Sequence, residues 1–102
     1  MKQAIIRRVL TGEWSAFRFP AKGKKFYVKN FSDSPAFVSF AAESSEASSF
    51  KLNANMGEEF QMSYADRPYP YGLINVIYVK ASGEVEVQSE DIIVPDDWEP
   101  EA

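Results

Sequence analysis

Apolar and polar residues alternate over short runs along this chain, and a period of two is typical of β-strands. No apolar spacing keeps a helical period for the roughly ten residues that a helix needs. The pattern therefore predicts an all-β protein. The expected strands cover residues 3–11, 14–19, 25–31, 36–41, 50–52, 58–62, 73–80, 84–88 and 92–94.

Turn-forming residues separate most of these runs, and four of the five glycines lie in a predicted turn, while Gly72 ends the proline-rich segment 63–72. The turns are expected at residues 11–13, 21–24, 32–35, 53–57 and 81–83. Two of the links, Asp33–Pro35 and Ser82–Gly83, predict tight antiparallel hairpins between the strands that they join. The polar stretch 42–49 predicts a solvated excursion or one helical turn capped by a serine.

Nine short strands in 102 residues favour an antiparallel two-sheet sandwich of the jelly-roll type, with a small β-barrel as the alternative. We expect one domain over residues 1–94, followed by an acidic, extended tail over residues 95–102, because Pro95 and Pro100 oppose strand pairing. The expected core residues are Phe26, Val28, Phe37, Phe40, Phe60, Ile74, Val76, Tyr78 and Val85.

The composition removes most catalytic chemistry, because the chain contains neither cysteine nor histidine. Disulfide scaffolds, thiol nucleophiles, histidine-based triads and the commonest zinc ligands are therefore excluded. The carboxylate pairs Glu58–Glu59, Glu90–Asp91 and Asp96–Asp97 are neighbours in sequence, and neighbours on a strand face opposite sides. We expect no enzymatic activity, no cofactor and no metal site.

Charge is unevenly distributed along the chain. Residues 1–29 carry eight bases and one acid, whereas residues 84–102 carry eight acids and no base. These charges are either the solvated faces of strands or a contact between the acidic end and the basic start, within or between chains. The acidic end would compete with phosphate, so we expect no nucleic-acid partner, although aromatic and basic residues interleave over 14–19 and 24–29.

Two segments are candidates for recognition. The segment 63–72 combines tyrosine, proline and an Asp-Arg pair, and such a loop offers rigid, amphipathic surface to a sugar or a protein; its alternative is a loop packed over one end of the domain. The tail offers one large anchor, Trp98. The candidate ligand- or partner-binding residues are therefore Tyr64, Asp66, Arg67, Tyr69, Tyr71 and Trp98.

The sequence Phe26–Phe40, the segments Phe50–Leu52 and Met56–Glu58, and the pair Ile77–Lys80 and Gly83–Gln88 together resemble a known group. This group consists of small β-proteins encoded by bacteriophages and prophages and associated with the virion head or fibre. The resemblance covers roughly residues 26–88 and implies a structural role in an oligomer, with no catalytic residue. The tail with Trp98 has no counterpart in the pattern.

From the resemblance and the residues together we expect a non-enzymatic subunit that decorates a capsid or accompanies a fibre. Its partners would be copies of itself and a capsid or fibre protein. No apolar run approaches the ~20 residues that cross a bilayer, so we expect no membrane partner and place the protein in the virion, assembled in the bacterial cytoplasm. The alternative function is a carbohydrate-binding module that stacks a surface glycan on Tyr64, Tyr69 and Tyr71, with Asp66 and Arg67 bonding its hydroxyls.

Overall fold

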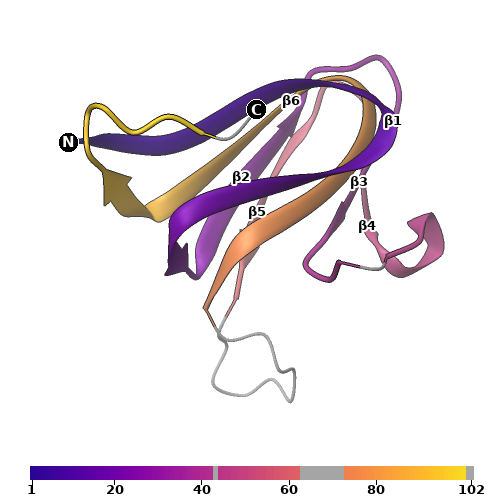
Figure 1. Cartoon of the computed structure of the whole chain (residues 1–102). Coiled ribbons are helices and arrows are strands. Elements are labelled where there is room, and N and C mark those ends of the chain that lie inside the picture. The colour runs from indigo at the N-terminus through magenta and orange to yellow at the C-terminus, as the bar shows by residue number, and fades with distance from the viewer. Residues whose placement is uncertain (43, 63–72, 101–102) are drawn as a thin grey trace.

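The computed structural model describes residues 1–42, 44–62 and 73–100 and contains one antiparallel β-sheet. Its elements are β1 (Lys2–Gly23), β2 (Lys25–Asn30), β3 (Ala36–Ser39), the 3-10 turn η1 (Glu46–Ser48), β4 (Phe50–Leu52), β5 (Gly57–Gln61) and β6 (Ile74–Val94). The all-β prediction is confirmed, and the sheet curls until it is nearly closed and barrel-shaped (Figure 1).

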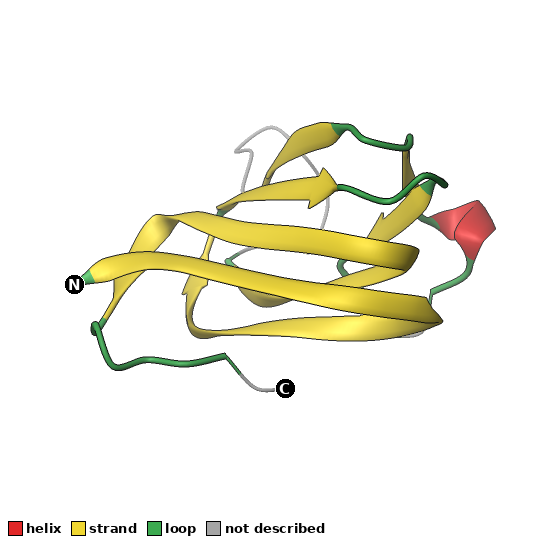
Figure 2. Cartoon of the chain, turned by 90° about the horizontal axis from the view of Figure 1, so that it is seen from above, coloured by secondary structure: helices red, strands yellow, loops and turns green. Residues whose placement is uncertain are grey.

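The strand β6 lies at the centre of the sheet. It pairs with β1 along one side, from Lys2 opposite Val94 to Gly23 opposite Ile74. On its other side, the half of β6 near its C-terminus pairs with β2, and the half near its N-terminus pairs with β3. The strands β5 and β4 then pair with β2 and β3, respectively. The sheet therefore consists of two halves that share the long β1–β6 ribbon, as Figure 2 shows.

The two halves meet at a sharp bend that runs through β1 and β6 and falls between β2 and β3 and between β4 and β5. In β1 the residues Gly12 and Glu13 lie opposite Ala81 alone, so the ribbon contains a bulge there. Gly12 has φ of 91°, a backbone conformation that glycine adopts without a Cβ penalty. On the other side of β6, the bend falls in the irregular segments 31–35 and 53–56.

Several turn predictions are wrong for this reason. The residues 11–13 and 81–83 do not end strands, because bulges let the chain bend while its ladder with the partner strand continues. Ser82–Gly83 therefore makes no hairpin. The link Asp33–Pro35 also makes none, since β2 and β3 follow one another along the same side of β6. The nine predicted segments merge into six strands, and the turn at 53–57 is confirmed. The turn predicted at 21–24 is reduced to a bend at Lys24, because β1 continues to Gly23.

A buried asparagine organises the bend between β2 and β3. Asn30 is only 1% exposed, and its side-chain amide donates to the carbonyl oxygens of Ser34, Leu52 and Asn53 at 2.8, 3.3 and 3.2 Å. Its side-chain oxygen accepts hydrogen bonds from the backbone and hydroxyl of Ser32. These bonds satisfy carbonyl groups that the interrupted ladder would leave unpaired. Asn30 therefore links the two irregular segments, 31–35 and 53–56, at the bend.

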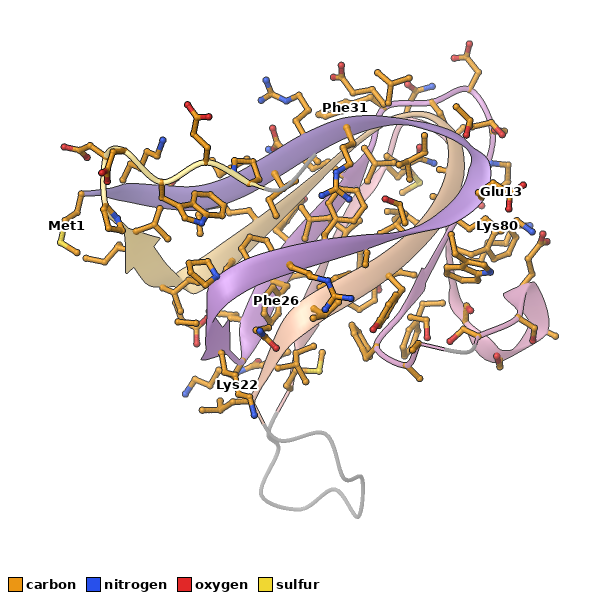
Figure 3. The ribbon with its side chains drawn as sticks, viewed as in Figure 1. Met1, Glu13, Lys22, Phe26, Phe31 and Lys80 are labelled. Atoms are coloured by element: carbon orange, nitrogen blue, oxygen red, sulfur yellow. The ribbon has the colours of Figure 1, made fainter. Side chains whose placement is uncertain are left out.

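The core lies between the two halves, where the labelled Phe26 lies in Figure 3. It contains Phe17, Phe19 and Ile77 as well as the predicted Phe26, Val28, Phe60 and Val85. Phe40 and Ile74 are partly buried against it. Phe37, Val76 and Tyr78 were predicted in the core but lie half-buried on the outer face, and their neighbours Val38, Ile77 and Val79 are buried instead. A shift of one residue exchanges the two faces of a strand.

Candidate interaction site at the C-terminal tail

The structure describes one of the six predicted binding residues, Trp98. The other five, Tyr64, Asp66, Arg67, Tyr69 and Tyr71, lie outside the described residues. The site is therefore built from the tail and from the strands that it contacts.

The tail begins where β6 ends, and its first residues form a turn in which the Trp98 amide donates to the carbonyl oxygen of Pro95 at 3.0 Å. This turn directs the indole ring back onto the sheet. The ring stacks on Phe19, with 6.5 Å between centroids and 19° between planes. Phe19 in turn lies 5.7 Å from Phe26 in the core. Trp98 therefore extends the aromatic core outward through Phe19.

The tail also contacts the opposite half of β1. Trp98 and Pro100 line an open groove of about 490 Å³ together with Lys2, Gln3, Ile5 and Arg7. Figure 1 shows the tail running beside this part of β1. Since Phe19 belongs to the other half of the strand, Trp98 bridges the two halves of β1. It covers the open side of the bent sheet.

Electrostatic attraction contributes little to holding the tail against β1. The N-terminal ammonium of Met1 lies 2.8 Å from the Asp96 carboxylate, and both groups are well exposed. An exposed pair of this kind contributes at most ~1 kcal/mol. Among the described backbone hydrogen bonds, none joins the tail to β1. The stacked indole is therefore the main contact that holds the tail.

A row of three charged residues crosses neighbouring strands, and one of them, Arg7, lines the groove. Arg7, Glu86 and Lys29 are paired in register across β1, β6 and β2. Arg7 Nε lies 3.0 Å from Glu86 Oε1, and Lys29 Nζ lies 3.3 Å from Glu86 Oε2. Burial alone would raise the pKa of Glu86, but the hydrogen bonds and charges of Arg7 and Lys29 lower it below its usual value. Arg7 is thus held beside the tail by a buried, ionised carboxylate.

The other open side of the sheet is closed by a different device, a triad of Phe40, Phe50 and Phe60. Their ring centroids lie 5.4–5.7 Å apart in every pairing. Phe60 is only 6% exposed, whereas Phe50 is 52% exposed. Because Phe60 belongs to β5 and Phe50 to β4, the triad joins the two halves of the sheet. It leaves one large aromatic face in contact with solvent.

A row of alternating aromatic and basic residues crosses the outer face. Trp14 pairs with Lys80, Lys80 with Phe37, and Phe37 with Lys51, from β1 to β4. Directly paired residues present their side chains on the same face. Lys80 also contacts Glu46 of η1, with Nζ 2.9 Å from Oε2. The row offers apolar rings and ammonium groups in turn.

One carboxylate pair that the sequence left undesignated comes together across strands. Partial burial raises the pKa of Glu90 above its usual value, and the neighbouring Glu59 carboxyl raises it further, against the opposing charge of Lys25.

Trp98 was predictable from the sequence, but Phe19, which stacks on it, and Arg7, which lines the same groove, were not. The signal for Arg7 was the opposite net charge of residues 1–29 and 84–102. In the structure, the tail lies against β1 of its own chain. No sequence signal distinguished Phe19 from the other core phenylalanines. Phe19 contacts Trp98 because the bend in β1 brings Phe19 to the side of the sheet where residues 2–7 also meet Trp98.

No family model, curated protein or solved structure matches the chain. Within the described ranges, no group of three or more acidic side chains is placed to hold a metal ion. Those residues also include no helix of the length and apolarity that crossing a membrane requires.

Proposed function

We propose that this protein is a non-enzymatic structural subunit of a phage or prophage particle, a capsid decoration or fibre-associated protein that acts by protein–protein adhesion. The resemblance over residues 26–88 supports the class of particle. The observation that carries the adhesive role is the tail, whose one aromatic anchor lies beside apolar side chains left in solvent. Met1 is 76% and Ile93 is 62% exposed where the tail leaves the sheet. Exposed apolar side chains grouped near an aromatic anchor favour an interface.

In this function the rigid sheet presents the adhesive end to copies of itself and to a capsid or fibre protein. Binding energy would come from aromatic and aliphatic side chains that lose their exposure on contact. The location would be the virion, after assembly in the cytoplasm of the bacterial host. No bond is made or broken, so no cofactor is required.

The test is quantitative mass spectrometry of purified particles from induced source cells. We expect peptides of this protein in a fixed ratio to the major capsid subunit. A matched pair of variants, Trp98→Ala and Trp14→Ala, then tests the adhesive end. We expect the first to leave particles depleted of the protein and the second to leave the ratio unchanged. Intact particles that contain none of the wild-type protein would overturn the proposal.

A second candidate function is carbohydrate binding, and the row Trp14–Lys80–Phe37–Lys51 favours it. Flat aromatic faces stack on the apolar faces of sugars, and ammonium groups bond hydroxyls and carboxylates. The predicted Tyr64–Tyr71 loop would add further stacking surface. A glycan panel with the wild-type protein, Tyr69→Ala and Trp14→Ala tests this function. Saturable binding that both folded variants weaken supports it, and no binding across the panel excludes it.

A further inference from the structure

We propose that the C-terminal tail exchanges between two copies of this chain, so that the Trp98 of each copy occupies the β1 groove of the other. The proposal rests on the proposed adhesive function, because it names a second copy as the partner of the tail site. It follows from four features of the site: weak retention of the tail, an acceptor already shaped for it, complementary charge and exposed apolar residues at the hinge.

The tail is held in its own groove by few contacts. The described tail contacts the sheet through the stacking of Trp98 on Phe19, one exposed ion pair between Met1 and Asp96, and the open groove that Trp98 and Pro100 line together with β1. Leaving the groove breaks no strand pairing, because β6 ends at Val94. The cost of release is therefore small compared with the cost of displacing any strand.

The acceptor does not need to change to receive a second tail. The groove residues Lys2, Gln3, Ile5 and Arg7 belong to a paired strand, and Glu86 holds Arg7 in place. The contacts of an exchanged tail are the same as those of the resident tail. The equilibrium is then decided by concentration and by any further surface that the two copies bury.

That further surface lies at the hinge. Only residues 95–97 separate the end of β6 from Trp98, and an extended chain spans at most ~3.6 Å per residue. Two copies can therefore exchange tails only by bringing these ends together. Ile93 and Met1 are exposed there, and Figure 3 shows Met1 at the end of the molecule away from the bend. Exchange would bury these apolar side chains around a two-fold axis.

The short hinge also determines the form of the assembly. Reciprocal exchange satisfies both grooves and closes the complex, so the product is a two-fold dimer rather than a filament. The acidic tail of each copy would lie on the basic β1 of the other, as it does within one chain. Salt would weaken this component of the contact but not the indole stacking.

The experiment uses the full chain and its lack of cysteine. One preparation carries Gln3→Cys, and a second, isotopically labelled preparation carries Pro100→Cys, both residues lining the groove. The two are mixed over a range of concentrations and treated with a short thiol-to-thiol cross-linker. We expect a mixed, cross-linked dimer by mass spectrometry, with a yield that rises with concentration and exceeds the yield from either preparation alone.

Two tail-donor variants provide the controls. Adding Trp98→Ala to the Pro100→Cys copy should lower the mixed-dimer yield about tenfold or more, whereas adding Trp14→Ala should not change it. Circular dichroism confirms that each copy is folded. A mixed-dimer yield that does not depend on Trp98, or cross-linking only within single chains of the Gln3→Cys/Pro100→Cys double variant, would overturn the exchange. Because purified protein is used, this failure is separate from absence from particles, which would overturn the proposed function instead.

Discussion

The bent sheet has two open sides, and the chain covers them in different ways. On the side of β1, the tail of residues 95–100 lies across the opening and places Trp98 on Phe19. On the side of β4 and β5, three phenylalanines that belong to or adjoin the strands pack against one another. One cover is an appended segment, and the other is part of the sheet.

This difference has a thermodynamic consequence. The tail can leave without breaking a backbone ladder, so the cost of opening is set by side-chain contacts: the Trp98 stacking, the packing along the β1 groove and one exposed ion pair. The phenylalanine triad is tied to the sheet, because Phe50 and Phe60 belong to the paired strands β4 and β5 and Phe40 directly follows β3. We therefore expect the β1 side to be the adaptable side and the β4–β5 side to be the stable side.

The largest expected effect on stability comes from truncating a side chain of the phenylalanine triad on the β4–β5 side. Phe60→Ala removes a ring that is buried in both the triad and the core, and we expect a loss of about 3–5 kcal/mol in the free energy of unfolding. Urea denaturation followed by circular dichroism measures it. A loss below that of Trp98→Ala would show that the triad does not hold the two halves together.

The next effect concerns the charged row beside the groove. Glu86→Gln should lower the free energy of unfolding by about 2 kcal/mol at pH 7, because Arg7 and Lys29 lose a charged acceptor. The exposed neighbour Glu84→Gln is the matched control and should change little.

The same variant predicts a pH dependence. The lowered pKa of Glu86 means that its contribution is fully present above the unfolded carboxyl pKa of about 4.3, and is lost as the pH falls through the lower, folded value. The wild type and Glu86→Gln should therefore converge in stability in acid. Denaturation curves at pH 7, 5 and 3, taken for both proteins, measure the difference. A gap that persists at the lowest pH contradicts this assignment.

A smaller effect on stability is expected when the tail loses the Trp98 side chain. Trp98→Ala should cost about 1–2 kcal/mol, less than a fully buried tryptophan, because the ring is half-buried and its removal leaves the sheet intact. Hydrogen exchange should accelerate in β1 near the groove but not in β4 or β5. Acceleration throughout the sheet would mean that the tail is an integral part of the fold.

The smallest effects on stability are expected for one exposed residue on each side of the sheet, Phe50 on the β4–β5 side and Asp96 in the tail. Phe50→Ala should cost about 1 kcal/mol, since half of its surface is already in solvent. Asp96→Asn should cost less than ~0.5 kcal/mol, and this difference should vanish at high salt. Thermal unfolding in low and high salt distinguishes the two variants.

Much of the secondary structure was predictable from local pattern. The period-two runs located the strand segments, because alternation of apolar and polar side chains reports directly on which face of a strand is buried. The turn at 53–57 followed from glycine and asparagine, whereas the turn at 21–24 was predicted too long, because β1 continues to Gly23. The hairpins at Asp33–Pro35 and Ser82–Gly83 were wrong, since the same residue types also occur inside a continuous paired strand, as at Ser82–Gly83, and in a link between two strands that follow one side of a third, as at Asp33–Pro35.

The candidate site was predictable in part. Trp98 was identifiable as a lone aromatic in an acidic, proline-containing end. The opposite charges of residues 1–29 and 84–102 left two interpretations open, solvated strand faces or a contact between the two regions. The stacking partner Phe19 was not identifiable, because it lies in the same alternating pattern as the other core residues.

By itself, the sequence determined that this chain forms short strands around an aromatic core, that it lacks thiol and imidazole chemistry, and that its ends carry opposite charge. These are properties of composition and of neighbouring residues. Only the tertiary structure decided that β1 and β6 run on through the bend and that β2 and β3 share one side of β6. It also decided that the two halves of β1 meet again at Trp98. Strand pairing joins residues far apart in the chain, and no local pattern specifies which partners the backbone ladder selects.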